Sequence, residues 1–499
     1  MTDHLINVEF QPGRSFQQQI REKLVDLIQK DYFGSAPLPS SRKMAQLLGV
    51  SRNTVMLVYE GLVDERFLIS KERSGYFVNP ELGEYELPQP LTDVSFEAPT
   101  GLAWQQRFKR VSANFNTLRK DKNWITYSHP FIYGQIEPTH FPIYQWRECT
   151  RIAQSRGTVH EWIEDYVDMD SKALIEQIRL NILPKRGITA APSEIILTMG
   201  TQNSFSLLAG VLTNEDTLVG LENPGYPDLR HIFSASRSRL KFLELDNQGV
   251  VVGDQLSQCD YVCVTPSHQY PTTVTMTIER RLQLLAQASE DDFIIIEDDY
   301  ESEVNFHDRP LPSLKSMDKE GRVIYTGSLS KSLSPGLRIG YLVADAELIK
   351  ELRTLRRLQY RHPPANNQTV AALFISQGYY DSHLRRMKTL YETKWNLMHE
   401  GLKKYLYQCE VTETRGSFCF WLRLPSSIKS EDLVRLASDY SILVESGDSL
   451  FAQNPAPKNF MRLGFSAIPE NKIDSGLKTL GELIERLQIE APTHAHTMN

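Results

Sequence analysis

The sequence has few cysteines and no long apolar run. Its five cysteines, Cys149, Cys259, Cys263, Cys409 and Cys419, form no Cys-x-x-Cys pair and no Cys/His zinc spacing. They predict free thiols in a reducing compartment and no metal site. No stretch approaches the roughly 20 apolar residues of a membrane-spanning helix, and the N-terminus has no apolar signal core. We therefore expect a cytoplasmic protein that does not contact a membrane.

The chain also lacks an excess of positive charge. Its formal net charge is -7, with 41% hydrophobic and 23% charged residues, as in globular proteins. No general basic field attracts nucleic acid, so any contact with DNA must come from individually placed residues. At 499 residues the chain is too long for one compact core, and two or more domains are expected.

The N-terminal region predicts a helix-turn-helix. Apolar residues recur at helical spacing between about residues 15 and 32. Ser40 or Ser41 then caps a short helix that ends at Gly49, and a second helix follows at once from Arg52. Two helices joined by a short turn with glycine form the helix-turn-helix arrangement. The same arrangement also occurs in helical bundles that bind no DNA.

The second of these helices would present its first residues to DNA. Arg52, Asn53 and Thr54 would face base edges and phosphates in the major groove. Two short strands, at 67–70 and 75–78, then predict a wing.

This region resembles the winged helix of GntR-type transcription regulators from about residue 15 to 79. The similar stretches are Leu-Pro-Ser-Ser-Arg, Leu-Gly-Val-Ser-Arg-Asn-Thr-Val and Gly-Tyr-Phe-Val. The resemblance implies that Arg42, Arg52, Thr54 and Gly75 contact DNA. The wing departs from the usual Gly-x-Gly type turn, because it reads Glu-Arg-Ser-Gly at 72–75.

Four segments are predicted along the chain. Residues 1–79 form the DNA-binding head, and residues 80–124, with several prolines and acids, form a linker. Helical patterns alternate with short apolar strands in residues 125–488, which predicts an α/β domain with a mainly parallel, buried sheet. Residues 489–499 form a disordered tail. The expected strands lie at 195–198, 218–221, 261–264, 293–296, 323–325 and 338–343.

The loop between the last two strands carries the most informative lysine. Lys331 follows Ser328 and Ser330 and precedes Arg338 by seven residues. A lysine amine forms a Schiff base with an aldehyde, while hydroxyls and a guanidinium hold a phosphate. The pattern therefore suggests pyridoxal phosphate, although an exposed loop lysine has the same local sequence.

Other strand ends carry groups that suit this cofactor. The amides of Gly200, Thr201 and Gln202 open a helix and form a phosphate cradle, or an ordinary turn. Tyr226 either stacks on a pyridine ring or packs in its Pro-Gly turn. Tyr300 can hydrogen-bond the ring hydroxyl oxygen.

Charged residues in two further strands suggest partners for the cofactor and for a ligand. One acid of Glu297-Asp298-Asp299 can pair with the pyridine nitrogen, and the alternatives are a solvated loop or a metal site. Arg462, in an apolar strand, needs an anion, either a ligand carboxylate or a structural salt bridge.

In order and spacing these motifs resemble the fold-type I aminotransferases, and above all the aminotransferase-like half of MocR/GabR-type regulators, over about residues 15 to 485. The resemblance implies that Lys331 is the Schiff-base lysine, Asp298 pairs with the ring nitrogen, Tyr300 meets the ring oxygen and Tyr226 stacks. It implies that Arg462 takes the carboxylate of an effector. The implied phosphate ligands are Gly200, Thr201, Gln202, Ser328, Ser330 and Arg338.

The sequence departs from aminotransferases at their Asn-Pro-Thr-Gly motif. Here Tyr270 precedes the proline and Thr273 replaces the glycine, in the Pro-Ser-His-Gln form usual in MocR-type regulators. His268 is then expected to approach the cofactor, and full transamination is expected to be weak. Asp228 and Arg230 are expected either to face an effector's amine and acid or to lie at the surface.

The resemblance implies a pyridoxal-phosphate-dependent transcription regulator that acts as a homodimer. It would bind operator DNA and sense a primary amine with a carboxylate or sulfonate through an external aldimine formed in place of Lys331. The alternative is an active aminotransferase with an accessory DNA-binding head. The stretches 130–135 and 224–228 look like those of MocR-type regulators of taurine or ectoine-derived diamino acid catabolism.

Overall fold

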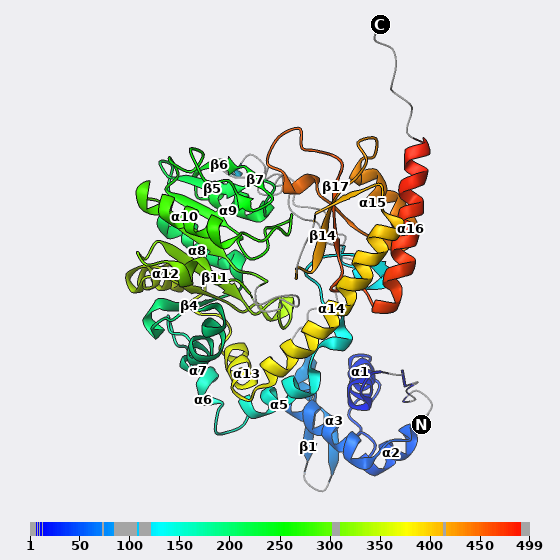
Figure 1. The fold of residues 1–499 in the computed structure, drawn as a ribbon. Helices are drawn as coiled ribbons and strands as arrows, with labels where there is room; N and C mark the ends of the chain where they lie inside the picture. The colour runs from blue at the N-terminus through cyan, green and yellow to red at the C-terminus, as the bar shows by residue number, and fades with distance from the viewer. Residues whose placement is uncertain are drawn as a thin grey trace. The chain divides into compact units, whose positions relative to one another are not determined.

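The computed structural model divides into two compact units, Met1–Arg110 and Val111–Asn499 (Figure 1). It describes residues 13–71, 74–83, 121–301, 310–412 and 416–490, with positions 6, 8, 10, 11, 107 and 108. Most of the expected linker and all but two residues of the expected tail lie outside these ranges. Within them, no helix is long and apolar enough to cross a membrane.

Described residues 13–83 of the first unit contain three α-helices and a two-stranded antiparallel sheet, as the sequence predicts. Apolar side chains from all three helices and from the first strand form its buried core, which includes Ile20, Met44, Val55 and Leu68. The elements are α1 (Phe16–Gln29), α2 (Ser41–Leu48), α3 (Arg52–Asp64), β1 (Leu68–Lys71) and β2 (Gly75–Val78).

Side-chain caps fix the turn between α2 and α3. Ser40, rather than Ser41, caps α2 by accepting a hydrogen bond from the amide of Lys43. Gly49 ends α2 at a φ of 66°, which favours glycine. Ser51 caps α3 by accepting from the amide of Thr54. The start of α3 is therefore defined by its own sequence.

A seven-stranded sheet forms the centre of the second unit. Its strand order is β4-β12-β11-β10-β9-β5-β6, and all neighbours are parallel except where β12 pairs antiparallel with β4 and β11. The strands are β4 (Ile195–Thr198), β5 (Leu218–Glu222), β6 (Arg239–Leu243), β9 (Tyr261–Val264), β10 (Ile294–Asp298), β11 (Val323–Ser328) and β12 (Gly340–Val343). The mainly parallel sheet is confirmed. The edge strand β6 was not predicted, because its residues alternate with lysine and arginine.

One predicted boundary was wrong. The strand expected from Arg338 begins at Gly340, because Arg338 adopts a left-handed conformation with a φ of 54° after a short turn at Pro335–Leu337. Arg338 therefore belongs to the loop that also holds Lys331.

Helices cover both faces of this sheet (Figure 1). On one face, α8 (Thr201–Leu212) and α12 (Ala346–Gln359) pack on Ile196, Ile296 and Leu342. On the other face, the helices pack on alternate residues of the same strands, such as Ile195, Ile295 and Tyr325. The other helices around this sheet are α7 (Lys172–Gln177), α9 (Pro227–Ala235), α10 (Ile278–Glu290), α11 (Leu314–Met317) and α13 (Ala365–Ser376), while α5 (Ile143–Ala153) and α6 (His160–Ile163) pack on α13.

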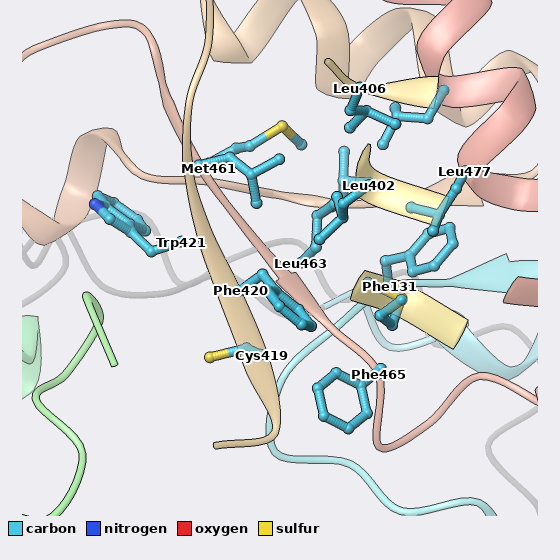
Figure 2. Packing of buried hydrophobic residues seen from close by; sticks show 14 of the residues in the cluster. Phe131, Leu402, Leu406, Cys419, Phe420, Trp421, Met461, Leu463, Phe465 and Leu477 are labelled. Carbon is cyan, nitrogen blue, oxygen red and sulfur yellow. The ribbon is translucent and has the colours of Figure 1, made fainter. Parts of the chain in front are cut away.

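A smaller antiparallel sheet lies beside the large one. Its order is β13-β14-β17-β16, and α14 and α16 run side by side along it (Figure 1). Figure 2 shows the buried cluster between them, in which Leu402 of α14, Leu463 of β17 and Leu477 of α16 meet. The elements are β13 (Glu410–Val411), β14 (Cys419–Arg423), β16 (Glu445–Ser446), β17 (Phe460–Gly464), α14 (Tyr379–Tyr405), α15 (Ser430–Asp439) and α16 (Glu470–Glu490).

Four further short strands form two separate pairs in this unit. β3 (His129–Pro130) pairs in parallel with β15 (Ile442–Leu443), and β7 (Leu245–Asp246) pairs with β8 (Gly249–Val250). The first pair attaches the N-terminal segment of the second unit to the small sheet region.

Candidate cofactor site

The ends of the large-sheet strands bring the predicted site residues to one edge. β5, β9, β10 and β11 are parallel, so Glu222, Asp298 and Ser328 end their strands at the same side. β12 runs the other way, and its first residue, Gly340, pairs with both Ser328 and Thr198. The loop that holds Lys331 therefore begins and ends at this edge.

Gly200 and Arg338 lie in direct contact at this edge. Gly200 has a φ of 88°, and a Cβ there would lie 2.9 Å from the Nη2 atom of Arg338. That Nη2 atom donates a hydrogen bond to the Met199 carbonyl at 2.7 Å. The amides of Thr201 and Gln202 follow in the first turn of α8, where helix geometry leaves N–H groups without intrahelical acceptors. The arrangement fits a phosphate.

The two serines add hydroxyl groups to this cradle. The Ser330 amide donates to the Ser328 hydroxyl at 3.1 Å, and both side chains are buried. The Ser330 hydroxyl has no hydrogen-bond partner within the described residues. Because a buried hydroxyl normally has a partner, this one fits a ligand oxygen.

The three consecutive acids have different surroundings. Glu297 accepts hydrogen bonds from the amides of Leu314 and Lys315, both at 2.9 Å. Asp299 forms a buried ion pair with Arg186 at 2.7 Å. Both carboxylates are therefore held by the protein itself. The choice among the acids, which the sequence left to resemblance, now has a physical basis.

Asp298 is the acid that remains for a ligand. Its carboxylate accepts from the Thr326 hydroxyl at 3.2 Å. Burial raises the pKa of Asp298 to about 7, although Thr326 and the Lys331 ammonium oppose this shift. A partly buried carboxylate of this kind gains from a cationic N–H partner, such as a protonated pyridine nitrogen.

Tyr226 and Tyr300 are partly buried, both pack against Tyr270, and both donate to protein atoms. The Tyr226 hydroxyl donates to Asp228 at 2.9 Å, as does the Gln202 side chain. The Tyr300 hydroxyl donates to the His268 carbonyl at 2.8 Å. Asp228 is thus held by two donors of the predicted cradle.

His268 lies in the interior as a neutral ring. Burial lowers the pKa of His268 to about 4, and the nearby guanidinium groups of Arg186 and Arg281 lower it further while Asp299 opposes them. Its Nδ1 atom has no hydrogen-bond partner within the described residues. A neutral imidazole can still donate or accept one hydrogen bond to a ligand.

Arg462 forms the structural salt bridge that was one of the two roles the sequence allowed. It is buried on β17 opposite Glu445 of β16, and its Nη2 atom lies 2.9 Å from Glu445 Oε2. Its Nη1 atom is buried without a hydrogen-bond partner in the described part of the chain. The salt bridge is therefore present, and one donor group remains for a further anion. Arg230, in contrast, donates to the carbonyls of Ser449 and Leu450.

The structure adds residues that the sequence did not single out. The Lys331 Nζ atom lies 4.2 Å from the centroid of the Tyr133 ring, and the Tyr133 hydroxyl donates to Glu301 at 2.9 Å. Glu222 is also buried at the site. Glu222 ends a buried strand, and Glu301 directly follows the predicted site residue Tyr300. Their positions at the ends of buried strands were the sequence signal that could have identified them. Tyr133 lies about 200 residues before Lys331, within the stretch 130–135 whose resemblance assigned no role to this residue.

The loop that departs from the aminotransferase motif has an unusual backbone. Thr273 adopts a φ of 65°, the region that favours glycine, at the position where aminotransferases carry glycine. Threonine therefore adopts here a backbone conformation that favours glycine. Tyr270 from this loop packs edge-on against Tyr226 and Tyr300.

The predicted DNA contacts lie in the first unit. Arg42, Arg52 and Asn53 are exposed, Thr54 is partly buried, and Gly75 begins β2 at a φ of 102°. Arg52 also donates to the Ser41 hydroxyl at 3.3 Å, which joins the starts of α2 and α3. Residues 72 and 73 of the wing lie outside the described ranges.

Comparison with known families divides the chain in the same way. Residues 16–78 match "Bacterial regulatory proteins, gntR family", and residues 143–480 match "Aminotransferase class I and II". The HTH-type transcriptional regulator TauR of Rhodobacter capsulatus is 36% identical, over 94% of this chain and 96% of its own length. The probable rhizopine catabolism regulatory protein MocR of Rhizobium meliloti is 28% identical, over 93% and 92%.

Solved aminotransferases share the fold of the second unit. Kynurenine aminotransferase of Pyrococcus horikoshii superposes with a TM-score of 0.70 at 27% identity, over 77% of this chain and 98% of its own. The α-aminoadipate aminotransferase LysN of Thermus thermophilus, complexed with N-(5'-phosphopyridoxyl)-L-leucine, gives 0.69 at 25% identity, over 78% and 100%. Together with the fit of the cradle, these relatives identify pyridoxal phosphate as the cofactor of this domain.

Glu222 makes a testable contribution to stability. Burial raises its pKa from an ordinary 4.5 to about 7, against hydrogen bonds from Thr265 and Gln269. The folded state holds this proton more tightly than the unfolded chain. Ionisation therefore destabilises the protein as pH rises through this window, and the loss persists above it.

We expect Glu222→Gln to remove this pH dependence. Between pH 5 and pH 8, the wild-type free energy of unfolding should fall by about 2–3 kcal/mol relative to the variant. Urea denaturation at the two pH values measures the difference. Glu351→Gln, on an exposed position of α12, is the matched control. If the free energy of unfolding changed equally with pH in wild type and in Glu222→Gln, the raised pKa of Glu222 would be contradicted.

Proposed function

Because this chain belongs to the MocR/GabR-type transcription regulators, which join a GntR-type winged helix to an aminotransferase-like domain, we propose that it senses a small amine at its cofactor site. Effector binding changes the affinity of the winged helix for operator DNA. The observation that carries this proposal is that Lys331 and Arg462 both contact the ring of Tyr133. Arg462 also keeps one buried nitrogen, Nη1, without a hydrogen-bond partner in the described residues.

The residues of the sheet edge divide the task of holding the cofactor. Pyridoxal phosphate, when bound, supplies an aldehyde that condenses reversibly with a primary amine. The Lys331 amine is the protein's own partner for it. Asp298 would keep a proton on the pyridine nitrogen, Tyr300 would meet the ring oxygen, Tyr226 would stack and His268 would approach the ring. The residues that would hold the phosphate are Gly200, Thr201, Gln202, Ser328, Ser330 and Arg338.

The effector carries an amine and an anion. Its amine takes the place of the Lys331 amine, and its anion pairs with the Nη1 atom of Arg462. A carboxylate and a sulfonate both accept the planar, always-charged guanidinium. Glu445 keeps Arg462 oriented while the anion is absent, because it engages the Nε and Nη2 atoms at 3.1 and 2.9 Å.

The winged helix reads DNA through its own few basic residues. Arg52, Asn53 and Thr54 enter the major groove from the capped start of α3, and Arg42 and Gly75 contact the adjoining backbone. The chain acts as a homodimer, so its two heads recognise paired half-sites. Coupling to the effector requires that occupied and unoccupied sites favour different arrangements of the protein.

An active aminotransferase with an accessory head is the second candidate. It is supported by the completeness of the cofactor cradle and by the aromatic-amino-acid aminotransferase 1 of Thermococcus litoralis, which is 30% identical over 58% of this chain. In that case the DNA-binding head localises an enzyme, and the operator affinity does not depend on the bound amine.

Replacing Arg52 tests the DNA-binding role. Arg52→Ala should weaken binding to DNA fragments selected from a random pool by at least about tenfold, because a base or phosphate contact is lost in each head. Cofactor absorbance should not change, since Lys331 lies in the other unit. Arg14→Ala removes an equally exposed arginine, paired with Glu22, and should change binding by less than about threefold. Equal effects of the two substitutions would contradict the proposal.

Replacing Arg462 tests the anion site. Wild type should prefer β-alanine or 2-aminoethanesulfonate over propylamine by at least about tenfold, measured by spectral titration of the cofactor. Arg462→Lys retains a charge for Glu445 but lacks the second donor arm, so this preference should approach one. Arg230→Lys is the matched control, because Arg230 donates to backbone carbonyls. An unchanged preference in Arg462→Lys would exclude Arg462 as the anion ligand.

A further inference from the structure

Both ends of the proposed effector site meet at the ring of Tyr133. This side chain is 4% exposed. The Lys331 Nζ atom lies 4.2 Å from its ring centroid, and the Arg462 Cζ atom lies 4.5 Å from the same point. Each distance falls within the range of a cation–π contact. One ring therefore contacts the lysine that joins the cofactor and the arginine proposed to bind the anion.

The polar atoms of Tyr133 hold two carboxylates. Its hydroxyl donates to Glu301 Oε1 at 2.9 Å, and its backbone N–H donates to Glu445 Oε2 at 3.1 Å. Burial, with a further contribution from Glu301, raises the pKa of Tyr133 well above its ordinary value, so the phenol remains a neutral donor. Glu445 is also the ion-pair partner of Arg462. Tyr133 thus lies between two cations and two anions.

This balance of charges depends on what occupies the site. Two cations near one ring repel each other in a dry interior, where charge interactions are strong. An incoming anion at Arg462 reduces this repulsion. An incoming amine leaves Lys331 as a free ammonium, which the ring face and Glu301 attract. Both events change the forces on the same residue, Tyr133.

The backbone of Tyr133 belongs to the segment that continues from the linker. In this segment β3 pairs with β15, and the Gly464 amide donates to the Phe131 carbonyl at 3.1 Å. A Cβ at Gly464 would lie 2.3 Å from the Ile132 carbonyl oxygen, so this peptide lies against β17 without intervening side chains. Residues 121–133 therefore form a continuous described path from the end of the linker to the site.

We propose that Tyr133 is the positioning residue that transmits effector occupancy to the linker segment. Its ring responds to the positions of Lys331 and Arg462, and its backbone moves residues 121–133. The inference rests on the proposed function and adds to it a physical route for the coupling. Tyr270 supplies a comparison, because its ring also lies 4.7 Å from Arg462 Cζ but its chain belongs to the 266–273 loop.

The test compares two loaded forms of the full-length protein. One carries pyridoxal phosphate, and the other carries N-(5'-phosphopyridoxyl)-β-alanine, a stable secondary amine that leaves Lys331 free. The measured quantity is the ratio of their affinities for DNA selected from a random pool. In wild type this ratio should differ from one by roughly 5- to 150-fold, the usual range of allosteric coupling.

Substitution of Tyr133 should remove the coupling selectively. In Tyr133→Leu the ratio should lie within about twofold of one, whereas Tyr133→Phe, which keeps the ring, should retain most of it. Tyr270→Leu should weaken adduct binding by roughly 2- to 30-fold through the lost cation–π contact, yet keep the wild-type ratio. A wild-type ratio in folded Tyr133→Leu would overturn the inference.

Other outcomes separate this inference from the function on which it rests. If the adduct does not bind wild type, or leaves its DNA affinity unchanged, the proposed sensing function fails. If Tyr133→Leu does not fold, the inference is tested instead by amide hydrogen exchange in the two loaded forms of wild type. Amides of residues 121–133 should exchange at different rates in the two loaded forms, and identical rates there, with altered DNA affinity, would overturn the role of Tyr133.

Discussion

The proposed effector site depends on one constraint, a buried guanidinium that uses only part of its hydrogen-bonding capacity. Arg462 is 1% exposed, and Glu445 satisfies two of its three nitrogens. Without Glu445 the charge would be too costly to bury, and with a second carboxylate from the protein there would be no place for a ligand. Glu445 thus makes burial of the Arg462 charge tolerable, and the Nη1 atom of Arg462 stays available for the proposed anion.

The three consecutive acids at the end of β10 are likewise distinguished by the partners that the protein provides for them. Arg186 neutralises Asp299, and backbone amides hold Glu297, so that Asp298 alone of the three remains for the cofactor. Burial then keeps its pKa high until a cationic partner arrives. The protein thus uses structural partners to select one reactive group from a run of similar ones, and the fold decides which.

The sequence predicted most of the fold and much of the site because those features are local. The serine cap before the first short helix, placed at Ser40 or Ser41, and the Ser-x-Ser-Lys loop are each contained within a few residues, as is each short apolar strand. The contacts that were missed are long-range. Tyr133 meets Lys331 from about 200 residues away, and Glu445 meets Arg462 across a strand ladder. No periodicity or motif encodes such pairs, since they arise only when the chain folds and segments from different elements come together.

The most direct test follows the visible absorption spectrum of the loaded protein while single amines that carry a carboxylate or sulfonate are added, with DNA affinity measured on the same samples. A sensor predicts that one compound shifts the cofactor band, that the shift persists, and that DNA affinity changes over the same concentration range. A band that is lost to the pyridoxamine form, returns with a keto acid and leaves DNA affinity unchanged would contradict sensing and identify a working aminotransferase.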